Sequence, residues 1–200
     1  MSDFAFDRQQ QAPYGNTSMT VLFSIILLCS IFILTWYSLY VLKNFGIKHD
    51  LSCTYYYLER RRKGSGKLFS FLLLLIIVFV IPVWIIITIN YTSVPRSVAV
   101  LPAMVGCGLA VVMFTPRYKR CRQLVYLHYG AAIIAAALSV IWIITVCPRL
   151  LMVVAVLSVF LGLLALRTRT LRTCTLFWLE LLDFYSIFII LLILLYVPYQ

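Results

Sequence analysis

The sequence predicts an all-α fold, a polytopic integral membrane protein built as a bundle of six transmembrane helices. Hydrophobic residues make up 64% of the 200 residues and charged residues only 12%, whereas soluble domains carry about 25% charged residues. The apolar residues also gather into separate stretches of the length that crosses a bilayer, roughly 20 residues. These stretches lie at about 20–42, 68–90, 97–115, 124–146, 150–166 and 174–197.

The basic residues predict the orientation of this bundle. Of the 17 Lys and Arg residues, 14 fall in the first, third and fifth connections between the apolar stretches. The other three are Arg8, Arg96 and Arg149. Because basic residues in short loops stay on the cytoplasmic side, we expect the odd-numbered connections in the cytoplasm and both termini outside it. The 14 residues are Lys43, Lys48, Arg60, Arg61, Arg62, Lys63, Lys67, Arg117, Lys119, Arg120, Arg122, Arg167, Arg169 and Arg172.

The same pattern predicts one domain. We expect an extracytoplasmic tail at 1–19, a single transmembrane domain at 20–197 and a short C-terminal end at 198–200. The longest connection is the cytoplasmic loop at 43–67. The tail is polar and the first apolar run is long, which is typical of a retained span and unlike a cleaved signal peptide.

Two features predict how the helices pack. Pro82 lies near the middle of the second stretch, where a proline kinks or interrupts a helix. Ala131, Ala135 and Ser139 recur every four residues in the fourth stretch. Small residues at this spacing let two helix backbones approach closely. We expect this face to pack against the fifth stretch, and the alternative is a face between copies of the chain.

Three ionisable side chains fall inside the predicted spans: His128, Glu180 and Asp183. At 1.5 Å per residue they lie about 6, 9 and 13 Å from the cytoplasmic ends of their helices. Ionisable groups inside a membrane are costly and mark functional sites by default. We therefore predict a buried polar site for a proton, a cation or a substrate amine. The alternative is structural, since acids near a helix N-terminus are favoured by its dipole.

The first cytoplasmic loop supplies a candidate lid for this site. It contains His49, Asp50 and Ser52, followed by three consecutive tyrosines at 55–57. Tyrosine suits a boundary between apolar and polar surroundings, so we expect residues 47–58 to be ordered and to contact the bundle. In that position His49, Asp50 and Ser52 would cover the buried layer. The alternative is an anchor that lies flat on the membrane.

The net charge of +11 predicts contact with anionic lipid and not with nucleic acid. The basic residues flank the apolar stretches, and no nucleic-acid-binding module is recognisable. No catalytic motif, metal-ligand spacing or cofactor fingerprint is present, and none of the six cysteines forms a Cys-x-x-Cys pair. The residues expected to hold anionic headgroups are Arg60, Arg61, Arg62, Lys63, Arg117, Lys119, Arg120 and Arg122.

Three short motifs carry a resemblance: HDLSCTYYYL after the first stretch, FTPRYK after the third and HYGAA opening the fourth. Together they resemble a group of small bacterial six-span proteins of unknown function, distantly similar to the damage-regulated autophagy modulator family. The resemblance implies a six-helix membrane fold, polar residues near Ser52 and His128, and a multi-pass protein of the bacterial inner membrane. It implies no activity, and it does not extend to Glu180 and Asp183.

These observations favour a non-enzymatic membrane protein that handles lipid, maintains the envelope or serves as a subunit. Its expected partners are membrane lipids, especially anionic ones, and further copies of the chain or a larger membrane complex. One alternative is a small transporter or channel that uses His128, Glu180 and Asp183. The other is a membrane-embedded hydrolase or transferase, which would lose activity on single substitutions at His128 or Asp183 while still folding.

Overall fold

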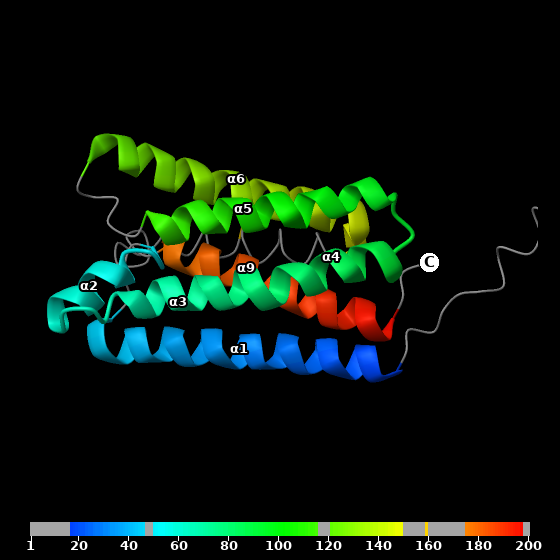
Figure 1. Ribbon diagram of the computed structural model, residues 1–200, viewed down its shortest axis with the longest axis horizontal. Coiled ribbons are helices and arrows are strands. Elements are labelled where there is room, and N and C mark those ends of the chain that lie inside the picture. The colour runs from blue at the N-terminus through cyan, green and yellow to red at the C-terminus, as the bar shows by residue number, and fades with distance from the viewer. Residues whose placement is uncertain (1–16, 47–49, 116–120, 150–158, 160–174, 198–200) are drawn as a thin grey trace, which may run out of the picture.

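The computed structural model describes residues 17–46, 50–115, 121–149, 159 and 175–197, and every secondary-structure element given for these ranges is helical (Figure 1). Five helical segments among them are long and apolar enough to cross a membrane. They are Thr17–Phe45, Lys67–Asn90, Arg96–Phe114, Arg122–Val146 and Thr175–Tyr196. Five of the six expected spans are thus present as helices, and the remaining one, the fifth stretch at 150–166, lies outside the described residues except for Val159.

The first of these segments is helix α1 (Thr17–Phe45) and the second is continuous through α3 (Lys67–Leu75), η1 (Ile76–Val80) and α4 (Ile81–Asn90). A short helix, α2 (Thr54–Arg61), lies between them. The third segment begins with η2 (Arg96–Ala99) and continues as α5 (Val100–Phe114). The fourth and fifth segments are α6 (Arg122–Val146) and α9 (Thr175–Tyr196).

The long helices run side by side as a bundle (Figure 1). Helix α5 packs against α6 on one side and against α3 and α4 on the other, while α9 contacts α1, α4 and α6. The beginning of α1 and the end of α9 lie at the same end of the bundle, opposite the end that carries α2 (Figure 1). The basic residues of loop 43–67 therefore share the end where α6 and α9 begin.

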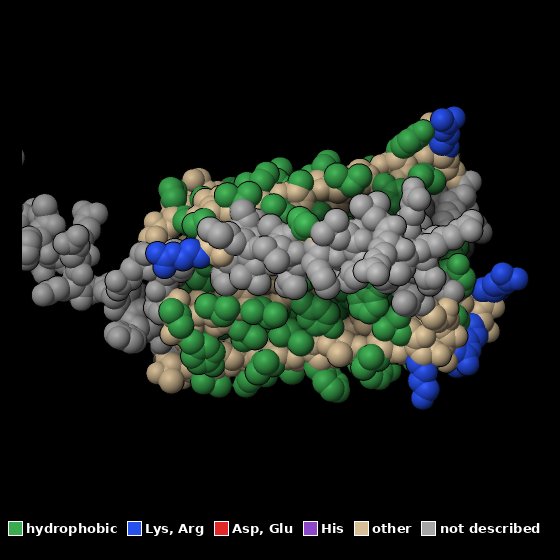
Figure 2. All heavy atoms as spheres, turned by 180° about the vertical axis from the view of Figure 1, so that it is seen from behind, with side chains coloured by type: hydrophobic (Ala, Val, Ile, Leu, Met, Phe, Trp, Pro, Cys, Tyr) green, Lys and Arg blue, Asp and Glu red, His purple; other side chains and the backbone are tan. Residues whose placement is uncertain are grey.

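The helices are apolar on their outer faces as well as on their inner ones. In α1, Leu27, Leu34 and Val41 are fully buried at seven-residue spacing, and on the opposite face Phe32 is 71% exposed and Leu39 60% exposed. Hydrophobic side chains run along the described parts of this face, and Lys and Arg gather at its ends (Figure 2). A helix that is apolar all round is typical of a membrane span.

The second span is interrupted near Pro82, as the sequence predicts. The five residues before Ile81 form a π-helical turn, η1, and Pro82 occupies the first turn of α4. Proline has no N–H, and its ring crowds the carbonyl of the preceding turn. A wider turn ahead of it relieves this conflict, and such π-bulges occur frequently at functional sites.

The small-residue face of α6 packs against α5. A Cβ added to Gly108 of α5 would lie 3.0 Å from the Cβ of Ala135 and 3.1 Å from the carbonyl oxygen of Ala131. This glycine therefore lets the two backbones approach closely. The fifth stretch, which is the expected partner of this small-residue face, lies outside the described residues. At least part of the face, Ala131 and Ala135, packs against α5, which the sequence did not indicate.

A pair of tryptophans anchors α4 to α6. The rings of Trp84 and Trp142 meet edge to face with centroids 5.0 Å apart, and both side chains are almost fully buried. The indole N–H of Trp142 donates to Thr88 Oγ1 at 3.0 Å. This contact, in the half of the bundle away from α2, fixes α4 after its π-helical turn.

We expect Gly108→Ala to lower the thermal stability of the purified protein, by about 1–3 kcal/mol, because the new methyl group overpacks the α5–α6 contact. Gly130→Ala, also in α6, is the matched control. A Cβ there meets nothing within 4 Å, so replacing this helical glycine should leave stability unchanged or raise it. Thermal unfolding followed by tryptophan fluorescence measures both. Equal effects of the two variants would contradict the proposed close contact.

Candidate functional site

The segment that follows residue 49 lies folded against the bundle. Asp50 and Thr54 are fully buried, and Leu51, Cys53 and Tyr55 are 3–5% exposed. The Tyr37 and Thr54 hydroxyls, from α1 and the start of α2, share a hydrogen bond. Residues 50–58 are thus ordered and in contact with the bundle, as their aromatic composition predicts. His49 lies outside the described residues.

Asp50 is the centre of a buried hydrogen-bond network at this end of the bundle. Its Oδ1 accepts from Ser52 Oγ at 2.9 Å and from the backbone N–H of Cys53 at 2.5 Å. Its Oδ2 accepts from the thiol of Cys53 at 3.1 Å and from the Tyr129 hydroxyl at 3.1 Å. These four donors compensate the burial of the carboxylate, and Tyr129 ties the segment to α6.

Glu180 and Asp183 lie one turn apart on α9, and each is held by one hydrogen bond. The backbone N–H of Leu51 donates to Glu180 Oε2 at 2.6 Å. The hydroxyl of Ser139, in α6, donates to Asp183 Oδ1 at 2.8 Å. The first bond attaches the loop segment to α9, and the second attaches α9 to α6.

His128 is buried at the start of α6, 1% exposed, beside the end of α5. Its Nδ1 shares a hydrogen bond of 3.0 Å with the hydroxyl of Thr115, and its ring meets that of Tyr129 edge to face. His128 is therefore next to the Asp50 network through its neighbour Tyr129, whose hydroxyl donates to Asp50, whereas Glu180 and Asp183 are on α9.

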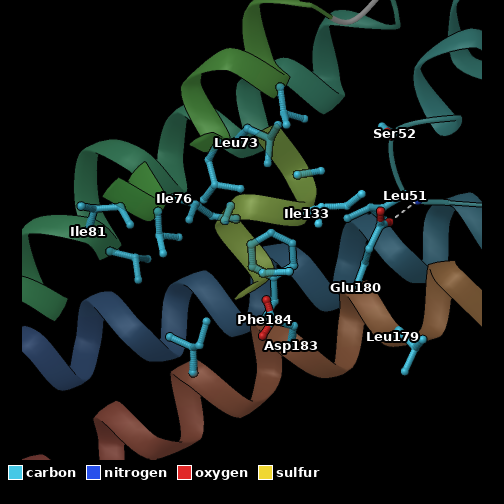
Figure 3. A pocket seen from close by; sticks show the side chains of 18 of the residues that line it. Leu51, Ser52, Leu73, Ile76, Ile81, Ile133, Leu179, Glu180, Asp183 and Phe184 are labelled. Carbon is cyan, nitrogen blue, oxygen red and sulfur yellow. Dashed lines mark hydrogen bonds between the residues drawn. The ribbon is translucent and has the colours of Figure 1, made fainter. Parts of the chain in front are cut away.

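A cavity of about 380 Å³ runs beside the two carboxylates of α9 (Figure 3). Leu51, Ser52, Glu180 and Tyr129 line it at the loop end. The rest of the wall is almost entirely apolar and comes from α3, η1, α4, α5, α6 and α9. Its members include Phe69, Leu73, Ile76, Val80, Ile81, Trp84, Val105, Leu109, Val112, Ala132, Ile133, Ala135, Ala136, Asp183, Phe184 and Phe188.

One polar atom in this wall lacks a partner. The indole Nε1 of Trp84 is buried and makes no hydrogen bond with any described residue. A buried donor without an acceptor costs about 1–3 kcal/mol. Phe69, near the loop end, and Trp84 line the same wall 15 residues apart, which corresponds to about 22 Å along a helix. The cavity is therefore long, with carboxylates toward the loop and an apolar opposite end.

The basic residues predicted to hold lipid headgroups lie on the surface, not in the cavity. Arg60, Arg61, Arg62 and Lys63 at the end of α2 are exposed, and so is Arg122 at the start of α6. Arg61 donates to Asn44 Oδ1 at 2.5 Å, and Arg122 donates to the Tyr126 hydroxyl at 3.1 Å. The other predicted headgroup ligands, Arg117, Lys119 and Arg120, lie outside the described residues.

The structure adds residues that the sequence argument did not single out for the site. Tyr129 follows His128 directly, but nothing in the sequence shows that its hydroxyl reaches Asp50. Ser139 was interpreted only as a small packing residue, yet it also binds Asp183. The sequence shows Thr115 and Trp84 only as residues within apolar stretches, and nothing in it predicts a role for them in the site. Among the described residues, no group of three His, Cys, Asp or Glu side chains is placed to hold a metal ion.

The comparisons with known proteins add no identity. No family model matches the chain, no curated protein matches it, and no solved structure matches it. The similarity to small bacterial six-span proteins therefore stays a prediction.

We expect Asp50→Asn to release the segment 50–54 from the bundle. The amide turns one acceptor oxygen into a donor that faces other donors, and an unsatisfied buried group costs about 1–3 kcal/mol. Hydrogen exchange in nanodiscs should show faster exchange at the amides of residues 51 to 54. Tyr129→Phe should show a smaller effect, and Tyr126→Phe, which removes an exposed hydroxyl on the same helix, should show none. Unchanged exchange in Asp50→Asn would disprove the anchoring role.

Proposed function

We propose that this protein is a non-enzymatic integral membrane protein that binds a lipid-like amphiphile inside its helical bundle. The observation that carries this proposal is the cavity of about 380 Å³ with a polar loop end and a long apolar body. Ligand pockets are typically about 300–1,000 Å³, mostly apolar and equipped with a few polar groups that orient the ligand. The volume and lining of this cavity match that description.

The shape of the cavity favours one extended chain over a compact ligand. Its wall follows the second span for about 22 Å, past the π-helical turn and on to Trp84. A polar headgroup fits beside Ser52 and Glu180, and an apolar tail fits between Ile76, Val80 and Phe188.

The ligand has a route from the membrane. Ile133 lines the cavity and is 67% exposed, and Ala136, one turn further along α6, also lines it and is exposed. The cavity wall thus reaches the outer, apolar face of α6. An amphiphile dissolved in the bilayer would enter sideways without crossing water.

The exposed basic residues at the same end support a second lipid contact. Arg60, Arg61, Arg62 and Lys63 lie next to one another at the end of α2, and clusters of this kind attract anionic headgroups at the inner leaflet. They would hold the loop end of the bundle at the membrane surface. We propose that this end is cytoplasmic and that both termini are outside.

We expect a cysteine at Ser65 to be labelled by a membrane-impermeant reagent only after the cells are permeabilised. Ser93→Cys, in the turn at the opposite end of the bundle, is the matched control and should be labelled in intact cells. Both variants are made in a background in which serine replaces the exposed cysteines of the described residues, Cys29, Cys107 and Cys121, and also Cys174, which lies outside the described residues. The reverse labelling pattern would contradict the proposed orientation. The location in a bacterial inner membrane rests on the resemblance alone.

A small transporter is the second candidate, and the two carboxylates inside the α9 span favour it. Intramembrane acids frequently line substrate and ion pathways. Uptake by proteoliposomes separates the two functions, since a transporter moves its amphiphile between leaflets or compartments, whereas a binding protein only retains it.

The cavity itself is tested by filling it. We expect Ala136→Phe to abolish retention of lipid during purification, as measured by native mass spectrometry of the protein released from detergent. Ala137→Phe is the matched control, because Ala137 is the next residue on α6 and is exposed without lining the cavity. This control should keep the wild-type level. Equal lipid retention in both variants would disprove binding in the cavity.

A further inference from the structure

The two carboxylates in the cavity wall have oxygens left over for a ligand. Glu180 Oε2 is occupied by the Leu51 N–H and Asp183 Oδ1 by the Ser139 hydroxyl. No hydrogen bond from a described residue is given for the other oxygens, Glu180 Oε1 and Asp183 Oδ2. Both residues line the cavity, so two acceptors are available at its polar end.

Among the described residues, the charged groups next to these acceptors are acidic. Among the described residues that line the cavity there is no Lys, Arg or His. Asp183 lies one turn from Glu180 on α9, and Asp50 directly precedes Leu51, whose N–H binds Glu180. Two of the described basic residues at the same end of the bundle bind other groups: Arg61 donates to Asn44, and Arg122 donates to Tyr126. An anionic headgroup would therefore be repelled from the polar end of the cavity.

A bare metal ion does not fit this end either, because the described residues provide no group of three suitable ligands. The available acceptors instead call for N–H or O–H donors. An ammonium group supplies three donors and a positive charge, and hydrogen bonds between two charged groups are roughly twice as strong as neutral ones. The long apolar wall beyond Asp183 requires a hydrocarbon chain on the same molecule.

We propose that the cavity selects a long-chain primary amine, with its ammonium group between Glu180 and Asp183 and its chain directed toward Trp84. The assignment rests on the proposed function and narrows its ligand to one chemical class. Asp50 contributes indirectly, because it holds Leu51 in place against Glu180. The selectivity comes from the two free carboxylate oxygens, and the chain contributes affinity without discrimination.

The test compares three probes with the same chain: hexadecylamine, hexadecanol and hexadecanoic acid. Each is titrated into the full-length protein in detergent micelles, and bound ligand is counted by native mass spectrometry. We expect the amine to bind at least about tenfold more tightly than the alcohol and the acid to bind most weakly. In the double variant Glu180→Gln and Asp183→Asn, the preference for the amine should disappear while the alcohol still binds.

Two controls keep the result interpretable. Glu59→Gln makes the same chemical change outside the cavity and should keep the amine preference. Retained alcohol binding in the double variant shows that the bundle still folds, since the amide oxygen introduced by Asp183→Asn can still accept from Ser139. Equal binding of amine and alcohol to the wild type, or an amine preference that survives in the double variant, overturns the amine assignment.

The same experiment separates this inference from the proposed function. If all three probes bind equally and Ala136→Phe blocks them all, the cavity binds amphiphiles and only the amine assignment fails. If no probe binds, or if Ala136→Phe leaves binding of every probe unchanged, both the proposed function and the amine assignment are wrong.

Discussion

The burial of Asp50 is the constraint on which the rest of the site depends. A carboxylate that is fully shielded from water requires several hydrogen-bond donors, and Asp50 obtains them from Ser52, from the backbone and thiol of Cys53, and from Tyr129. Satisfying it forces the chain after residue 49 to fold back under α6. That fold-back presents the Leu51 N–H to Glu180. The loop end of the cavity is therefore built around one buried acid.

This arrangement explains how carboxylates persist inside an apolar bundle. A charged group at the centre of a membrane helix costs about 2.5–3.5 kcal/mol on insertion scales. Asp183 and Glu180 each recover part of that cost through one hydrogen bond, from Ser139 and from Leu51. Neither is paired with a cation among the described residues. The remaining cost is the physical reason to expect a ligand with donors, and it connects the fold of the loop to the chemistry of the cavity.

Much of the fold follows from the sequence, because hydropathy fixes where helices cross a membrane. The described spans begin and end within a few residues of the apolar stretches, and the break at Pro82 appears as a π-helical turn. The acids Glu180 and Asp183 were also identifiable, since intramembrane charge is rare. The partner of the Ala131 and Ala135 face was not, because small-residue spacing predicts close packing without naming the neighbour. The structure shows that Gly108 of α5 fills that place.

The cavity could not be predicted from the sequence, for a related reason. Its walls combine residues from α3, α4, α5, α6 and α9, and their mutual distances depend on helix packing that hydropathy does not encode. The hydroxyls of Tyr129, Ser139 and Thr115 gained their roles only through that packing. By contrast, the contact of residues 50–58 with the bundle follows from local composition, since tyrosines adjacent to an interface bury their rings.

The most direct test of ligand binding inside the bundle is a crystal structure grown from a lipidic mesophase with a long-chain amine that carries bromine at its far end. The account predicts an anomalous bromine peak near Trp84 and amine nitrogen density within about 2.7–3.2 Å of Glu180 and Asp183. A cavity filled by side chains of the protein itself, or a bromine peak only on the outer surface of the helices, would contradict it.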